Sequence, residues 1–78
     1  MNIRGKKIVV VGLGKTGYDV ADFLLKKGAK VFITEEKEDE ETCKKSQFFE
    51  RKGATVELGK HTEEFLEGSD FVVISPGV

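Results

Sequence analysis

A glycine-rich loop near the start of the chain has the spacing that binds phosphate in other proteins. Gly12, Gly14 and Gly17 form a G-x-G-x-x-G pattern directly after the apolar run 8–11. In a strand–loop–helix unit, the first glycine allows a sharp turn and the second lets a diphosphate approach the backbone. The third lets the helix pack closely on the strand. Because free N–H groups and the helix dipole favour an anion there, the pattern predicts a nucleotide diphosphate site.

Two polar residues inside the loop can assist that site. The ammonium group of Lys15 can offset phosphate charge, and the hydroxyl of Thr16 can donate to a phosphate oxygen. A solvated lysine in the first turn of a helix is an equally good interpretation of Lys15. The segment 14–16 also imitates the end of a Walker A loop, but that motif requires glycine where this chain has Val9.

An acidic residue follows the loop at the distance typical of dinucleotide-binding domains. Glu35 lies about twenty residues beyond the glycines, at the end of a second apolar run, where an acid can bind ribose hydroxyls. Glu36 and Glu38 are close by, so the sequence leaves open which acid faces the ligand. A plain charged loop is the alternative interpretation.

A turn at the end of the chain is the third candidate for ligand contact. Ser75, Pro76 and Gly77 follow the last apolar run. Ligands of open parallel sheets bind at the carboxyl ends of the strands, so we expect this turn to line the same site. Ser75 is not a credible nucleophile, because the chain has no G-x-S-x-G elbow and no histidine near it in sequence.

The remaining reactive residue types are isolated in the sequence. His61 stands alone in a polar stretch and is expected to be solvated, and Cys43 is expected at the boundary of the core. Neither has neighbours with the spacing of a metal site. We therefore expect this segment to bind a ligand without catalysis and without a cofactor of its own.

Alternating strands and helices must position these residues. Apolar runs predict four strands and three helices between them, with Gly28 and Gly53 as helix stops and Thr62 as an N-cap. The second helix has a thin apolar face made of Cys43, Phe48 and Phe49. The expected strands are 7–11, 30–34, 54–58 and 70–74, and the expected helices are 15–27, 40–52 and 62–66.

This order predicts one α/β domain over residues 1–78, a Rossmann-like open parallel sheet with helices on both faces. The connections between parallel strands are expected to be right-handed crossovers, and the strand order by analogy is 3-2-1-4. The third strand alternates apolar and polar residues, as edge strands do. We also expect the chain to be an N-terminal fragment of a longer protein, because nothing after 74 supplies a further crossover.

Composition excludes several classes of protein. With 78 residues and a net charge of −1, the chain is one small domain without the basic surface of a nucleic-acid binder. Because residues 1–7 are polar, we expect no signal peptide; the sequence has no apolar run long enough to cross a membrane, and it has one cysteine. We therefore expect a cytoplasmic protein that engages neither nucleic acid nor a membrane.

Three segments together resemble one enzyme family. The glycine loop 9–17, the strand segment 53–59 and the ending 70–78 are similar to the N-terminal domain of the UDP-N-acetylmuramoyl-L-alanine:D-glutamate ligases, which are Mur ligases of peptidoglycan synthesis. The resemblance covers essentially the whole chain, but only the first of that family's three domains. The glycine loop alone is shared by many Rossmann-like proteins, whereas the VVISPGV ending is more specific.

The resemblance implies a role for each candidate residue. This domain would hold the UDP end of UDP-N-acetylmuramoyl-L-alanine, with Gly14, Lys15 and Thr16 at the diphosphate. Glu35 and Glu36 would lie near the uridine, and the turn 75–77 would line the same pocket. ATP and magnesium would bind the central domain and D-glutamate the C-terminal one. The full enzyme would phosphorylate the L-alanine carboxylate, and the D-glutamate amine would then attack the acyl phosphate.

The sequence departs from the family at one place and leaves two alternatives open. Glu-Glu-Lys follows the second strand, where the family more often has Asp and a small polar residue, which puts the uridine contacts in doubt. One alternative is the NAD(P)-binding domain of an oxidoreductase, supported by the glycine pattern and Glu35. The other is a nucleotide-sensing regulatory domain of a transporter or channel subunit.

Overall fold

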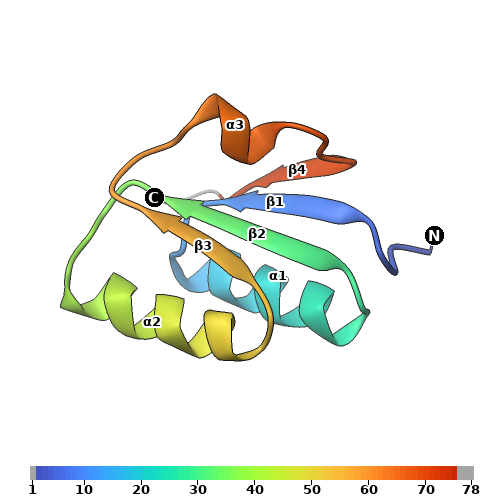
Figure 1. The fold of residues 1–78 in the computed structure, drawn as a ribbon. Helices are drawn as coiled ribbons and strands as arrows, with labels where there is room; N and C mark the ends of the chain where they lie inside the picture. Colours follow the sequence, from blue (N-terminus) through green and yellow to red (C-terminus); the bar gives the residue numbers. More distant parts are fainter. Residues whose placement is uncertain (1, 76–78) are drawn as a thin grey trace.

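The computed structural model describes residues 2–75, which form one parallel sheet flanked by helices. The four strands run in the order β3-β2-β1-β4, as predicted. In Figure 1, α1 and α2 cover one face of the sheet and α3 lies over the other. The elements, in chain order, are β1 (Lys7–Val11), α1 (Lys15–Lys26), β2 (Lys30–Glu35), α2 (Glu40–Arg51), β3 (Thr55–Leu58), α3 (Glu63–Leu66) and β4 (Phe71–Ile74).

The two inner strands are the buried ones, whereas the equally apolar outer strand β4 is largely exposed. Ile8, Val9 and Val10 of β1 are buried, as are Val31 and Ile33 of β2. A continuous β-branched run suits a strand that is covered on both faces, so these sequences take the centre of the sheet. The outer strands β3 and β4 each pair with a single neighbour in the described chain. The predicted edge position of β3 is confirmed.

The core lies between the sheet and the first two helices. Ala21 and Leu24 of α1 pack there, together with Phe49 of α2, which is fully buried. Tyr18 joins the two helices, because its ring lies 5.5 Å from the Phe48 ring and 4.9 Å from the Phe49 ring. Phe48, expected on the apolar face of the second helix, makes this contact with its side chain still partly exposed.

Helix α2 begins with a complete capping box. The carboxylate of Asp39 accepts a hydrogen bond from the Thr42 amide at 2.8 Å, and the Thr42 hydroxyl accepts one from the Asp39 amide at 2.9 Å. Two backbone donors that the first turn leaves without helix partners are thereby satisfied. The buried face of α2 consists of Thr42, Ser46 and Phe49. Two of these three residues are small and polar, which explains why the apolar face of this helix looks thin in the sequence.

The short helix α3 is attached through an aromatic contact. The Phe65 ring lies 5.5 Å from the Phe32 ring of β2, edge to face. Thr62 occupies the predicted N-cap position, but the predicted side-chain cap is wrong. The Thr62 hydroxyl donates to the carboxylate of Glu57 at 2.7 Å instead, because that partly buried acceptor competes for it.

Where the predicted element ends differ from the observed ones, they differ by one residue. Asp70 precedes β4, because both its amide and its carboxylate bond the backbone of Lys7 at the start of β1. Glu35 joins β2, since its carbonyl accepts from the Gly59 amide at 2.8 Å. No helix among residues 2–75 is long and apolar enough to cross a membrane. The predicted site residues Pro76 and Gly77 lie outside the described residues.

Candidate functional site

The glycine loop lies where three strands end. Gly12 follows β1 and donates its N–H to the carbonyl of Thr34 on β2 at 2.9 Å. Ser75, after β4, donates its N–H to the carbonyl of Val11 at 2.9 Å. Gly12 has a φ of 100°, in the left-handed region that favours glycine, so its predicted role in the turn is confirmed. The carboxyl ends of β1, β2 and β4 thus meet at the loop.

The other two glycines serve different purposes. A Cβ added to Gly17 would lie 2.0 Å from the carbonyl oxygen of Gly12, so only glycine lets α1 approach the loop this closely. The predicted packing role of Gly17 is confirmed. A Cβ on Gly14 would meet nothing within 4 Å. Space for a ligand is therefore open beside Gly14, and its phosphate contact stays a prediction.

The first turn of α1 presents free backbone donors. Gly14 is the N-cap residue and, within the part of the chain described, no side chain caps this end of α1. Lys15 and Thr16 are exposed there, and the first turn contains no acidic residue. The uncapped amides and the helix dipole favour an anion at this point.

A cavity of about 230 Å³ opens beside the loop, at the carboxyl ends of β1, β2 and β4. Four residues singled out from the sequence line it together: Gly12, Glu35, Glu36 and Ser75. The other three lining residues, which the sequence did not indicate, are Val11, His61 and Ile74. His61 could have been found from topology, since the loops after parallel strands gather at one edge of the sheet.

Ser75 lines this cavity and has a buried hydroxyl that points toward α1. The residue is 4% exposed, and its Oγ has no hydrogen-bond partner among the described residues. The hydroxyl faces α1, because a Cβ built on Gly17 would lie 3.3 Å from it. An unpaired buried hydroxyl costs free energy unless a ligand or water completes its bonding. Ser75 is therefore suited to ligand contact.

Glu35 lies at the end of β2 and at the cavity, as expected, but its hydrogen bonds were not foreseen. Its side chain is buried, with the residue only 3% exposed, and both carboxylate oxygens already accept backbone hydrogen bonds. Oε1 accepts from the Leu13 amide and Oε2 from the Lys37 amide, each at 2.7 Å. A ribose hydroxyl would therefore have to compete with two backbone amides for the Glu35 carboxylate. Glu36, by contrast, is exposed at the cavity.

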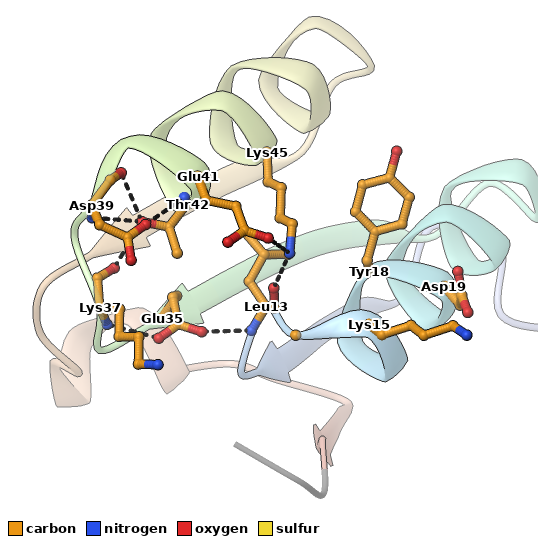
Figure 2. Close-up of a pocket in the computed structure, with 11 residues that line it drawn as sticks. Leu13, Lys15, Tyr18, Asp19, Glu35, Lys37, Asp39, Glu41, Thr42 and Lys45 are labelled. Carbon is orange, nitrogen blue, oxygen red and sulfur yellow. Dashed lines mark hydrogen bonds and ion pairs between the residues drawn. The ribbon is translucent and has the colours of Figure 1, made fainter.

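A second, larger cavity of about 460 Å³ lies on the other side of Glu35, between the starts of α1 and α2. Gly14 and Lys15 line it, and Figure 2 shows its side chains. Lys45 of α2 reaches across to donate to the Leu13 carbonyl at 3.2 Å and pairs with Glu41 at 3.3 Å. Lysines and acids alternate around this cavity, so it has no single dominant charge.

His61 is exposed but is not simply solvated, which corrects the expectation. Its Nδ1 lies 2.6 Å from the hydroxyl of Thr34, which is itself within hydrogen-bond distance of Glu57. Burial raises the pKa of Glu57, but hydrogen bonds from Thr62 and Thr34 outweigh it and hold the pKa below its ordinary value. The loop after β3 is thereby tied to the end of β2.

The described residues hold no group of three or more histidine, cysteine or acidic side chains arranged to bind a metal ion. Cys43 is half-buried on α2, as expected for a boundary position, and forms no disulfide.

The sheet order, the glycine loop and the cavity at the strand ends define a domain of the Rossmann class. Two solved structures share the fold. A precorrin-2 dehydrogenase, SirC, aligns over all of this chain and 38% of its own, with a TM-score of 0.76 and 20% identity. The malate dehydrogenase of Cryptosporidium parvum aligns over 95% of this chain and 25% of its own, with a TM-score of 0.63 and 26% identity.

Sequence comparison gives the family. Residues 6–78 match the family described as Mur ligase MurD-like, N-terminal domain, and the chain belongs to it. UDP-N-acetylmuramoylalanine–D-glutamate ligases of Koribacter versatilis and Geotalea daltonii are 44% and 46% identical to it over 78 residues. The match covers all of this chain and 17% of each relative. The chain thus spans about one sixth of the length of these ligases.

Proposed function

We propose that this chain is the domain that holds the UDP end of UDP-N-acetylmuramoyl-L-alanine in an ATP-dependent ligase that adds D-glutamate. The proposal is supported by the family and by the names of the ligases that the chain resembles over its full length. The observation that carries it is the uncapped start of α1: Gly14 and Lys15 line the larger cavity, and Gly17 lies close to Ser75, which lines the smaller one.

The chain's own residues would divide the binding between them. First-turn amides of α1 would donate to the diphosphate, and the open space at Gly14 would let its oxygens approach. The exposed Thr16 hydroxyl would add a bond, and the Lys15 ammonium would reduce the local negative charge. Glu36 and Ser75 would line the pocket on the uridine side.

The bond-forming step would take place on parts of the protein outside this chain. ATP would transfer its γ-phosphoryl group to the L-alanine carboxylate, giving an acyl phosphate and ADP. The amine of D-glutamate would attack that carbonyl, an amide would form, and phosphate would leave. ATP and magnesium would bind elsewhere in the protein. The residues described here would contribute by anchoring the far end of the substrate, because remote binding energy positions the reacting group.

The competing function is binding of NAD. Its support is the fold, which the two dehydrogenases share, and the presence of an acid at the end of β2. The hydrogen bonds that already occupy Glu35 favour the UDP substrate, because a dinucleotide site of this class uses that acid for the ribose.

Titration of the native chain and of Gly14→Val with UDP tests the proposal. We expect amide shifts at Gly14, Lys15 and Thr16 in the native chain. The valine variant should fold, since open space lies at Gly14, and its affinity for UDP should fall at least about tenfold, because the side chain occupies the diphosphate's space. A folded Gly14→Val protein that binds UDP normally would refute the assignment of the loop.

A further inference from the structure

The carboxylate of Glu35 links two backbone segments that the sheet alone would not hold together. One oxygen accepts from Leu13, inside the glycine loop, and the other from Lys37, in the loop after β2. Figure 2 shows the carboxylate between the two amides. The distances of 2.7 Å are those of strong, charge-assisted hydrogen bonds. The backbone of Glu35 is also fixed, because its carbonyl accepts from Gly59.

The peptide groups at Leu13 are held from both sides. Glu35 holds the amide, and the ammonium of Lys45 holds the carbonyl at 3.2 Å. The Leu13 side chain is 1% exposed, so packing fixes it as well. Leu13 lies between the two glycines that shape the phosphate approach. Its position therefore decides where the amides at the start of α1 point.

We propose that Glu35 is a positioning residue for the glycine loop and does not itself bind the nucleotide's ribose. This inference rests on the proposed function of the loop and deepens it. In dinucleotide-binding domains, the acid at this position selects a ribose through its 2′-hydroxyl. Here the same carboxylate is buried and engaged by backbone amides, so the site does not select for a 2′-hydroxyl through Glu35. UDP and 2′-deoxy-UDP should bind with dissociation constants that agree within about twofold.

Glu35→Gln separates positioning from direct contact, because it keeps the size of the side chain and removes one acceptor. Its amide NH₂ must face one of the two backbone N–H groups, so one hydrogen bond is lost. We expect hydrogen exchange at Leu13 or Lys37 to accelerate at least about tenfold. Binding of UDP and 2′-deoxy-UDP should weaken by the same factor, about tenfold, in protein that is still folded.

Asp70→Ala, which removes a carboxylate that accepts from one backbone amide, is the control. The Asp70 carboxylate accepts from the Lys7 amide at 2.8 Å, which is the same kind of bond at the opposite end of β1. This variant should lose stability without a change in the affinity for UDP. A purely structural role of Glu35 would make the two variants alike: both would melt earlier, and both would bind UDP as the native chain does.

Three results would overturn the inference. The first is a native chain that prefers UDP over 2′-deoxy-UDP by tenfold or more, with a preference that Glu35→Gln abolishes, since Glu35 would then contact the ribose. The second is hydrogen exchange at both the Leu13 and the Lys37 amides that is as fast in the native chain as in the glutamine variant. The third is an unchanged affinity of Glu35→Gln for both nucleotides. A native chain that binds neither nucleotide, yet shows a Leu13 amide protected by Glu35, would contradict the proposed function. It would still support the role of Glu35 in holding the backbone of the glycine loop.

Discussion

At the scale of single residues, the three glycines of the loop have separable roles. Gly17→Ala should lower the free energy of unfolding by about 3 kcal/mol or more, because its Cβ would lie 2.0 Å from a backbone oxygen that cannot easily move. Gly14→Ala is the matched control, because its Cβ meets open space. Urea unfolding of the two variants measures the difference. Equal stabilities would contradict the packing described for the start of α1.

Thr16 is the second residue whose role can be isolated. Thr16→Ala removes an exposed hydroxyl, so the fold should be unaffected. Loss of one hydrogen bond to a charged phosphate should weaken UDP binding by about 1.5–3 kcal/mol, or roughly 10- to 100-fold. Calorimetric or NMR titration of the variant provides the measurement. An unchanged dissociation constant would show that the Thr16 hydroxyl does not touch the phosphate.

The sequence allowed several residues of this site to be predicted, but not the hydrogen bonds that they make. Gly12 and Gly17 could be assigned their roles because the glycine pattern encodes backbone geometry that other residues cannot adopt. The bonds of Glu35 could not be predicted, since the register between a loop and a strand end decides which amides a carboxylate meets. His61 was taken as solvated for the same reason, although Thr34 lies beside it in space.

At the scale of elements, the start of α2 depends on Thr42. Thr42→Val keeps the shape but removes the hydroxyl that accepts from the Asp39 amide. Because Thr42 is buried, the loss should cost about 1–3 kcal/mol in the free energy of unfolding. Thr55→Val on the exposed edge strand β3 is the control, and it should be nearly neutral. A stable Thr42→Val protein would mean that the capping box contributes little.

The helices and strands were predictable where residues that start or stop an element, such as glycine, agree with the periodic pattern of apolar residues. The helix α1 ends at Lys26, shortly before the predicted stop at Gly28, where a φ of 85° suits glycine. The buried face of α2 was less visible, because Thr42 and Ser46 line it and neither belongs to an apolar pattern. The side-chain cap expected at Thr62 failed because a carboxylate from β3 takes its hydroxyl.

At the scale of the whole molecule, stability should fall in acid. The Thr42 amide holds the pKa of Asp39 below its ordinary value, and Lys26 does the same for Asp22 through a side-chain hydrogen bond. With the lowered pKa of Glu57, the folded chain binds fewer protons than the unfolded one below about pH 5. This contribution is complete above the unfolded pKa values, near 4, and is lost as the pH drops through the folded values.

Urea unfolding at pH 6 and pH 3 measures that dependence. The free energy of unfolding should be smaller at pH 3. Asp39→Asn keeps an acceptor for the cap but does not titrate, so its stability should change less between the two pH values. A native chain that is equally stable at both would contradict the lowered pKa values.

The sheet order was predictable as a whole because few topologies satisfy right-handed crossovers with short connections. The cavity was predictable in place, at the carboxyl ends of the strands, but not in its full lining. Val11, His61 and Ile74 reach it only because three strands end together there.

The central claim is that the glycine loop binds a UDP-linked substrate. The most direct measurement is an amide NMR titration of this chain with UDP-N-acetylmuramoyl-L-alanine, with NAD in a parallel titration. We predict shifts at Gly14, Lys15 and Thr16 with the UDP compound and none with NAD. Shifts at those residues with NAD alone would contradict the claim and support a nicotinamide-dependent oxidoreductase instead.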